Sequence, residues 1–308
     1  INKSSSNCGV LYHDGTFDDA RLALNLAQTC VENGGVTLNY CKVISLIKDA
    51  GNKICGANIS DKETGRVYNV KAKVAINATG VFADEILKLE NESAKSIIRP
   101  SQGIHLVLDH SFLQSEDAIM IPHTDDGRVL FAIPWQHNVL VGTTDTPLNA
   151  HSLEPRALEN EVDFILKTAT KYLTKAPKRA DVLSVFAGLR PLAATDDTKE
   201  KTKEISRSHK VIVSDSGLVS VIGGKWTTYR KMAEDTLAKI IKLQMLPFKK
   251  GITENFKIHG YTLKTSNDAL SMYGADEKAM KELLVDNEQW ALPVSNESDI
   301  LVVQIIWA

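Results

Sequence analysis

Residues 219–242, VSVIGGKWTTYRKMAEDTLAKIIK, constrain the fold more than any other stretch of the sequence. An apolar strand runs into two glycines, a lysine and two threonines, and an amphipathic helix follows. Gly223 and Gly224 let the backbone pass close to a ligand, and the free N–H groups of the helix N-terminus favour an anion at that point. We therefore expect a mixed α/β chain with a binding turn here.

The turn differs from a phosphate-binding P-loop, whose pattern is G-x-x-x-x-G-K-[ST]. Val219 stands where the first glycine is required, and Trp226 stands where a hydroxyl would hold magnesium. The features that remain are the charge of Lys225 and a helix end, with Thr227 or Thr228 as its cap. A helix N-terminus stabilises a nearby anion by roughly 0.3 to 2 kcal/mol. A reduced flavin is one ligand that suits this turn, and an ordinary capped helix is the alternative.

Composition narrows the class of protein. A chain of 308 residues with 43% hydrophobic content can bury a large core, either in two domains or in one domain with an appendage. The net charge of -2 and the absence of a long basic block argue against nucleic acid as a partner and favour a small molecule. No apolar run approaches the roughly 18 residues of a membrane span. The cysteines form no C-x-x-C pair, so we expect buried thiols in a reducing compartment and no metal site: Cys8, Cys30, Cys41 and Cys55.

Hydrophobic periodicity predicts the order of the elements. We expect a helix over residues 17–32 with Thr16 as its cap, and then a strand and an antiparallel excursion that ends in a buried strand over residues 73–78. A helix near Phe82 follows, and residues 97–141 form antiparallel strands. The remaining predictions are a helix over 156–173, a strand over 181–192, a solvated loop over 195–206, a hairpin around Ser216-Gly217 and a helix within 275–287.

Short motifs recur along the chain in a fixed order. They are INATG at 76–80, SQGIH at 101–105, IPW at 133–135, GTTD at 142–145, GLRPL at 188–192 and GGKWTTYR at 223–230. Together they resemble the FAD-dependent glycerol-3-phosphate dehydrogenase family, within the D-amino-acid-oxidase-like superfamily. The resemblance covers about residues 9–242, and the remaining tail is similar to the C-terminal helical domain of that family.

The resemblance implies a domain plan. Residues 1–95 would form part of an FAD-binding Rossmann-like domain with a β-meander, and residues 96–208 an antiparallel-sheet domain that binds substrate. Residues 209–245 would supply the last FAD-binding strand and helix, and residues 246–308 part of a C-terminal helical domain. The expected fold class is therefore α/β combined with α+β.

The resemblance also implies a reaction in glycerol metabolism. Glycerol 3-phosphate would be oxidised to dihydroxyacetone phosphate, with hydride passing to N5 of FAD and electrons leaving to a quinone or to oxygen. It further implies a cytoplasmic protein that contacts the inner face of the membrane peripherally, and it leaves a homodimer open.

Three residues are implied to carry the chemistry. Arg190 offers a planar fork suited to a phosphate or an alkoxide oxygen, and Lys225 would lie over flavin and substrate. His105 would receive the hydroxyl proton, although its strand of alternating apolar residues is also typical of a core histidine. These three residues and Thr227 would bind substrate. The residues implied to contact FAD are Lys42, Val43, Ala78, Thr79, Gly80, Gly188, Gly223, Gly224, Lys225, Trp226, Thr227 and Thr228.

The sequence departs from the family pattern at one diagnostic element, since no stretch reads G-x-G-x-x-G. Residues 300–308, ILVVQIIWA, stop inside an apolar element without a cap. We therefore expect a fragment, and we expect the isolated chain to be inactive and to bind FAD weakly or not at all.

Two other functions are compatible with these residues. An amine or amino-acid oxidase on the same fold would use an arginine to hold a carboxylate. A non-catalytic binding module would keep the fold without turnover, but such a module has no reason to retain Arg190, Lys225 and the small residues of both turns together.

Overall fold

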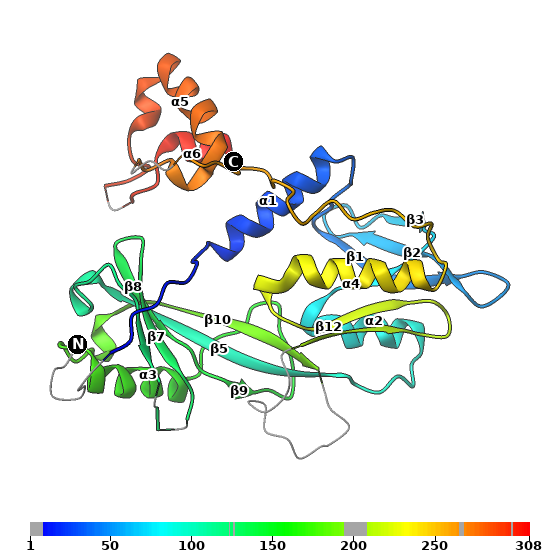
Figure 1. The fold of residues 1–308 in the computed structure, drawn as a ribbon, viewed down its shortest axis with the longest axis horizontal. Helices are drawn as coiled ribbons and strands as arrows, with labels where there is room; N and C mark the ends of the chain where they lie inside the picture. Colours follow the sequence, from blue (N-terminus) through cyan, green and yellow to red (C-terminus); the bar gives the residue numbers. More distant parts are fainter. Residues whose placement is uncertain (1–8, 123, 126, 194–207, 265–267, 297) are drawn as a thin grey trace. The chain divides into compact units, whose positions relative to one another are not determined.

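The computed structural model describes residues 9–122, 124–125, 127–193, 208–264, 268–296 and 298–308 (Figure 1). The chain divides into two compact units. The first unit contains residues 1–11 and 40–249, and the second contains residues 12–39 and 250–308. The loop predicted over residues 195–206 lies outside the described residues.

The first unit begins with an antiparallel meander. Strand β1 (Cys41–Lys48) pairs with β2 (Ile54–Asp61), and β2 pairs with β3 (Val67–Lys71). The turn between β2 and β3 is held by the Asp61 carboxylate, which accepts a hydrogen bond from the Thr64 hydroxyl at 2.6 Å. The antiparallel excursion predicted from the sequence is therefore confirmed.

A second sheet combines the segments around two of the motifs. Strand β12 (Val219–Gly223) pairs antiparallel with β11 (His209–Val213) and parallel with β4 (Ile76–Asn77). Helix α4 (Tyr229–Lys242) follows β12, and α2 (Ala83–Glu90) follows β4 through the 3₁₀ helix η2 (Gly80–Phe82). The hairpin predicted around Ser216-Gly217 is confirmed.

The strand predicted over residues 73–78 is wrong in length and burial. Only Ile76–Asn77 has strand pairing, and the Ile76 side chain is half-exposed, while Asn77 is buried. The apolar residues in this run suggested a buried strand, but β4 lies at the end of its sheet among the described strands, so one edge has no neighbour there.

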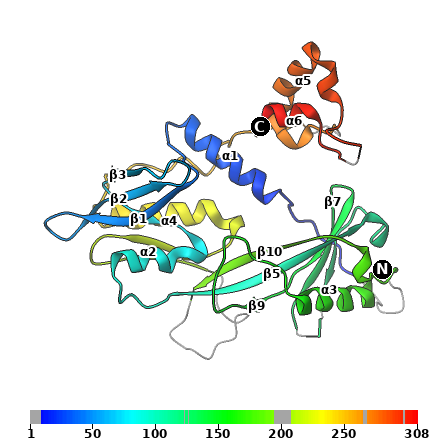
Figure 2. The ribbon, with the colours of Figure 1, turned by 180° about the vertical axis from the view of Figure 1, so that it is seen from behind.

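The largest sheet orders its strands β10-β5-β8-β7-β6, and β9 also pairs with β5. The long strands β5 (Ile98–Asp109) and β10 (Val182–Ala193) lie side by side, as Figures 1 and 2 both show. The shorter strands are β6 (Ile119–Ile121), β7 (Leu130–Trp135), β8 (Asn138–Gly142) and β9 (Thr146–Pro147). The 3₁₀ helix η3 (His110–Phe112) follows β5 in the chain, and the 3₁₀ helix η4 (Arg179–Asp181) precedes β10.

Helix α3 (Glu159–Tyr172) covers one face of this sheet (Figure 2). Because side chains alternate between the faces of a strand, every second residue of β5 packs toward the helix. The residues buried together there are Ile104, Leu106, Leu108, Leu130, Ala132, Val139, Val141, Val162, Ile165, Leu166 and Ala169. Ser101, Gly103 and His105 consequently belong to the opposite face.

The second unit joins helix α1 (Asp19–Glu32) to the C-terminal helices. These are the 3₁₀ helices η6 (Ser271–Asp276) and η7 (Glu288–Ala291), together with α5 (Glu277–Asp286) and α6 (Val302–Trp307). Leu270, Met280 and Val303 form its buried core. The imidazole of His259 links the two parts, with Nδ1 lying 2.6 Å from Glu32 and Nε2 lying 2.8 Å from Asp276.

Two helix starts differ from the sequence prediction. Helix α1 begins at Asp19 and not at residue 17, and Asp18, not Thr16, caps it by accepting a hydrogen bond from the Arg21 N–H at 2.9 Å. Helix α3 begins at Glu159 and not at residue 156. The helix predicted within 275–287 appears as α5.

The described residues contain no helix that is long and apolar enough to cross a membrane. Within the same residues, no cluster of histidine, cysteine or acidic side chains could hold a metal ion. Cys30, Cys41 and Cys55 are free thiols, and Cys8 lies outside the described residues. The prediction that the thiols are buried is wrong for these three, because Cys30 is exposed and Cys41 and Cys55 are only half-buried.

Candidate functional site

Arg190 lies on the face of the large sheet opposite α3, on β10 beside Ser101 of β5. Its Nη2 donates a hydrogen bond to the Thr143 hydroxyl at 3.1 Å, and its Nη1 lies 3.6 Å from the Asp145 carboxylate. The side chain is 28% exposed. A cationic fork that is held by two neighbours and is still partly open can bind an anionic group.

Glycines make room for the two polar side chains on this face. A Cβ at Gly103 would lie 2.3 Å from Arg190 Nη2, and a Cβ at Gly142 would lie 2.3 Å from His105 Cδ2. Both distances are below 3.0 Å, so a side chain at either position would have to displace the guanidinium or the imidazole. Gly188 lies on β10 and pairs with Gly103 of β5. A Cβ at Gly188 would have no heavy atom of the described residues within 4 Å, so there is open space at this position, two residues before Arg190.

His105 lies between neighbouring strands, opposite Gly142 of β8 and Phe186 of β10. Its ring stacks on Phe186, with centroids 5.2 Å apart and planes 14° apart. Burial lowers the pKa of His105, and the positive charge of Arg190 lowers the pKa further. The imidazole is therefore neutral near pH 7 and can accept a proton.

The turn after β12 has the backbone conformation that its glycines permit. Gly223 and Gly224 have φ values of 70° and 83°, in the left-handed region that other residues rarely adopt. A Cβ at Gly224 would lie 2.6 Å from the Met232 sulfur. The turn therefore packs directly against α4.

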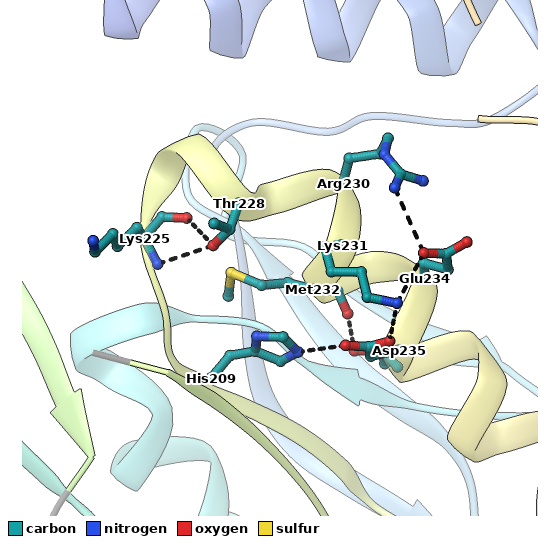
Figure 3. Close-up of polar contacts among 9 residues, drawn as sticks. His209, Lys225, Thr228, Arg230, Lys231, Met232, Glu234 and Asp235 are labelled. Carbon is teal, nitrogen blue, oxygen red and sulfur yellow. Dashed lines mark hydrogen bonds and ion pairs between the residues drawn. The ribbon is translucent and has the colours of Figure 1, made fainter. Parts of the chain in front are cut away.

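Thr228, one of the two threonines predicted as a cap, is the N-cap residue of α4, but it does not act through its side chain. A 3₁₀ helix, η5 (Trp226–Thr228), separates the glycines from α4, and Thr228 makes no side-chain cap bond to α4. Its hydroxyl instead donates to the Lys225 carbonyl at 3.0 Å (Figure 3). Because of this extra 3₁₀ turn, α4 begins at Tyr229. The pattern of apolar and polar residues could not predict this start.

Lys225 is exposed and its ammonium forms no ion pair with the described residues. The nearby charges are paired among themselves, since His209 Nε2 lies 3.0 Å from Asp235 and Lys231 Nζ lies 2.8 Å from the same carboxylate (Figure 3). A guanidinium nitrogen of Arg230 lies 3.6 Å from the Glu234 carboxylate, one helical turn further along α4. Lys225 thus keeps its charge available for a ligand.

The end of β10 contacts the glycine turn within the same unit. A Cβ at Gly223 would lie 3.6 Å from the Cβ of Ala193. Because Ala193 follows Arg190 by three residues and Gly223 precedes Lys225 by two, the fold brings the two cationic residues to neighbouring segments.

The INATG turn is built around Asn77, which the sequence analysis did not single out. The buried Asn77 amide donates to the Ala83 carbonyl at 3.0 Å and accepts from the Thr79 hydroxyl at 2.7 Å. Gly80 has a φ of 59°, and a Cβ there would have no described heavy atom within 4 Å. Ala78 and Thr79 are exposed, so the backbone of this turn is open to a ligand.

Lys42 and Val43 lie on the meander strand β1, away from the sheet that carries Arg190. Lys42 is exposed and lies 3.9 Å from Glu85 of α2. Trp226 and Thr227 lie in η5 and are exposed, and the Trp226 ring lies 5.5 Å from the Tyr229 ring.

The fold therefore groups the predicted residues into three clusters. Arg190, His105 and Gly188 share one sheet face. The residues of 223–228 form the turn beside the end of β10. Residues 78–80 form the turn that follows β4, and β4 pairs with β12. Lys42 and Val43 belong to none of these clusters.

The sequence analysis missed the residues that support Arg190. Thr143, Asp145 and Phe186 contact the two key side chains, and Glu161 lies behind them. One signal was present: GTTDT places hydroxyls and a carboxylate in a run directly after an apolar strand. Asn77, a polar residue in an apolar run, was a second signal.

A sheet face with a held arginine and a neutral histidine, next to a strand–glycine–helix turn, is an arrangement suited to oxidising a bound anion beside a planar cofactor. A protein-family model described as FAD dependent oxidoreductase (DAO) matches residues 4–230. This match covers most of the chain, and the chain belongs to the FAD-dependent oxidoreductase family. The predicted family and fold class are thus confirmed.

Within that family the chain is similar to glycerol-3-phosphate dehydrogenases. It is 40% identical over 259 residues to the mitochondrial enzyme of Schizosaccharomyces pombe and 42% identical over 253 residues to that of Arabidopsis thaliana. These alignments cover 79% and 82% of this chain and 40% of each relative.

A solved structure has the same arrangement. The glycerol-3-phosphate dehydrogenase of Bacillus halodurans complexed with FAD superposes with a TM-score of 0.71 and 31% identity, covering 89% of this chain and 51% of that chain. The chain thus spans about half or less of the length of the proteins it matches.

Proposed function

We propose that the protein containing these residues oxidises sn-glycerol 3-phosphate to dihydroxyacetone phosphate with FAD as the hydride acceptor. The observation that carries the proposal is the pairing of Arg190 with a neutral His105 on one open sheet face. The names of the similar proteins support the same substrate.

The described residues fit the ring end of a flavin. The φ values of Gly223 and Gly224, the open space at Gly80 and the charge of Lys225 provide close backbone approach and positive charge. FAD, when bound, would take the hydride from the substrate carbon. The chain contains no G-x-G-x-x-G segment for the pyrophosphate, and Lys42 and Val43 would lie nearest the adenine.

Different side chains of this chain would then bind the substrate and accept its proton. Arg190 would hold the phosphate or the alkoxide oxygen with its guanidinium group, and Lys225 and Thr227 would hold the anionic end from the glycine turn. A ring nitrogen of His105 would receive the hydroxyl proton, which requires the neutral imidazole that burial and Arg190 maintain.

The deciding test is turnover by the full-length protein with glycerol 3-phosphate and an artificial electron acceptor. We expect activity that Arg190→Ala reduces by about a hundredfold or more, because a preorganised charge at the reacting group is lost. Turnover of glycine or D-amino acids without turnover of glycerol 3-phosphate would instead identify an amine oxidase. No turnover of either substrate class would support the binding module.

We further propose a quinone as the electron acceptor, a homodimer, and peripheral contact with a membrane. The names of the relatives support a mitochondrial location as an alternative to the predicted cytoplasmic one. Reduction of a ubiquinone analogue, with oxygen consumption measured in parallel, tests the acceptor. Sedimentation of the full-length protein with vesicles tests the membrane contact.

Flavin binding by the chain itself is a separate question. We expect the purified 308-residue chain to bind FAD weakly or not at all, because its residues supply the ring end of the site and no pyrophosphate cradle. An absorption spectrum that shows one bound flavin per chain would contradict this expectation.

A further inference from the structure

Glu161 is a buried carboxylate in the first turn of α3, and none of the three clusters above includes it. Its residue is 3% exposed, and no cationic side chain of the described residues forms an ion pair with it. It is held by four hydrogen-bond donors instead. These are the Thr146 hydroxyl at 2.6 Å, Gln102 Nε2 at 2.7 Å, the Leu158 N–H at 2.9 Å and the Thr144 hydroxyl at 3.0 Å.

These donors keep Glu161 ionised. Burial raises the pKa of its carboxyl, but the hydrogen bonds from Thr146, Leu158 N–H, Gln102 and Thr144 lower the pKa by more, and the net direction is downward. A buried anion satisfied by four directional donors fixes the position of each donor, because each lost bond leaves a buried polar group unpaired.

Two of the donors belong to the segment that also holds Arg190. Along this segment Thr144 and Thr146 turn toward Glu161, whereas Thr143 and Asp145 turn toward the open face. The Thr143 hydroxyl accepts from Arg190 Nη2 at 3.1 Å, and the Asp145 carboxylate lies 3.6 Å from Arg190 Nη1. The segment thus connects a buried carboxylate on one side to the guanidinium on the other.

Further hydrogen bonds fix the segment of residues 143–146 against β5. The Thr144 hydroxyl accepts the Ile104 N–H of β5 at 3.0 Å, in addition to its bond to Glu161. The Ser101 hydroxyl of β5 donates to Asp145. A displacement of Thr144 would therefore move Thr143 and Asp145 relative to β5, and with them their contacts with Arg190.

We propose that Glu161 is a positioning residue for Arg190, acting through Thr144 and Thr146 on the segment that carries Thr143 and Asp145. This inference rests on the proposed function, in which Arg190 binds the substrate. An arginine fork recognises phosphate only in a defined orientation, so its support sets the affinity and rate for the substrate.

Two conservative variants of the full-length protein test the proposal. Glu161→Gln keeps the volume but puts an NH₂ group against two of the four donors, and Thr144→Val keeps the shape but removes the bridging hydroxyl. We expect each to lower kcat/KM for glycerol 3-phosphate by about ten- to a hundredfold, since small misplacements of a binding group have effects of this size. Glu159→Gln is the matched control, because Glu159 lies on the same helix with an 81% exposed side chain.

A double-mutant cycle separates positioning from general support of the fold. If Glu161 acts through Arg190, Thr144→Val and Glu161→Gln change kcat/KM much less in an Arg190→Ala background. Equal fold-losses in both backgrounds, or thermal destabilisation with unchanged kcat/KM, would overturn the proposal. Should Glu161→Gln fail to fold, Thr144→Val carries the cycle.

A readout without turnover keeps the inference separate from the proposed reaction. Because the Arg190 charge lowers the pKa of His105, displacement of Arg190 raises that pKa. We expect Thr144→Val to raise the pKa of ¹³C-labelled His105 in the full-length protein, and to leave it unchanged in the Arg190→Ala background. An unchanged His105 pKa in the single variant would refute the positioning role even if glycerol 3-phosphate is not the substrate.

Discussion

At the scale of single residues, the positions of the Arg190 and His105 side chains depend on the residues of the neighbouring strands that they pack against. Gly103 and Gly142 have no side chain, and the guanidinium and the imidazole occupy the space that a Cβ would need. The stacking of Phe186 on His105 removes water from one side of the ring. Two glycines and one aromatic residue therefore help to place the imidazole and the guanidinium.

The charge of Arg190 should be visible in the titration of His105. We expect Arg190→Ala to raise the pKa of His105, because one of the two causes that lower the pKa is removed while burial remains. The acid limb of the kcat/KM pH profile should move to higher pH, since the neutral imidazole is then lost at a higher pH. Arg190→Lys retains a charge and serves as the control. An acid limb that stays in place in Arg190→Ala would show that the two groups are not coupled.

Gly142→Ala should damage the site more than the fold. The new Cβ would lie 2.3 Å from His105 Cδ2, so the imidazole has to move away from its place against Phe186. We expect kcat to fall by about ten- to a hundredfold through this misplacement. Gly188→Ala, whose Cβ has open space, should leave the melting temperature unchanged. Full kcat in Gly142→Ala would mean that the His105 position does not matter.

At the scale of elements, the turns that face the expected cofactor are held by buried polar groups on their inner side. Asn77 joins β4 to the start of α2, and the His209–Asp235 pair joins β11 to α4. The glycines of both turns are then free to adopt positive φ values. The rigidity of each turn comes from neighbouring elements and not from the turn residues themselves.

Asn77→Ala should destabilise the INATG turn. The variant removes two side-chain hydrogen bonds, the one that Asn77 donates to the Ala83 carbonyl and the one that it accepts from the Thr79 hydroxyl. We expect the free energy of unfolding to fall by about 1 to 3 kcal/mol, the usual cost of such a loss. Urea unfolding of the full-length protein measures it. Asn69→Ala, at an exposed position of β3, is the matched control and should change the free energy little.

The sequence predicted helices and strands correctly where the period of the apolar residues distinguishes one from the other. The strands β5, β7 and β8, the hairpin of β11 and β12, and helix α5 follow alternation or 3.6-residue periodicity. The prediction failed over residues 73–78, because an apolar run does not tell whether a strand has a neighbour on each side. It also missed η5, since a 3₁₀ turn and an α-helix start share the same residue preferences.

At the scale of the whole molecule, the second unit depends on contacts between distant parts of the chain. His259 lies between Glu32 of α1 and Asp276 at the end of η6, and its backbone N–H donates to the Thr29 hydroxyl at 2.9 Å. The guanidinium of Arg21 lies 4.1 Å from the centroid of the Tyr273 ring. These contacts unite residues 12–39 with the C-terminal segment into one compact unit.

The stability of the second unit should depend on pH through His259. Hydrogen bonds to Glu32 and Asp276 raise the pKa of His259 above its ordinary value of about 6.5. The charged imidazole therefore stabilises the fold fully below about pH 6.5, and the contribution is lost as pH rises through the raised pKa.

His259→Gln should remove this pH dependence. We expect the melting temperature of the variant to fall below that of the unmodified protein at pH 5.5, and the difference to shrink at pH 9. Scanning calorimetry at both pH values measures it. His13→Gln, at an exposed position of the same unit, is the control. A difference that is equally large at both pH values would show that the charge of His259 is not involved.

The sequence by itself indicated the fold class, because glycine turns and hydrophobic period are local properties, and its ordered motifs carried the resemblance to the family that the comparisons confirm. It also identified Arg190, His105 and Lys225, whose roles stay predictions. Only the tertiary structure decided that Arg190 and His105 share one face of the sheet, because strand register sets which residues are neighbours. The support by Glu161 likewise became visible only in the fold, since it joins residues from a helix and two sheet segments that are far apart in the sequence.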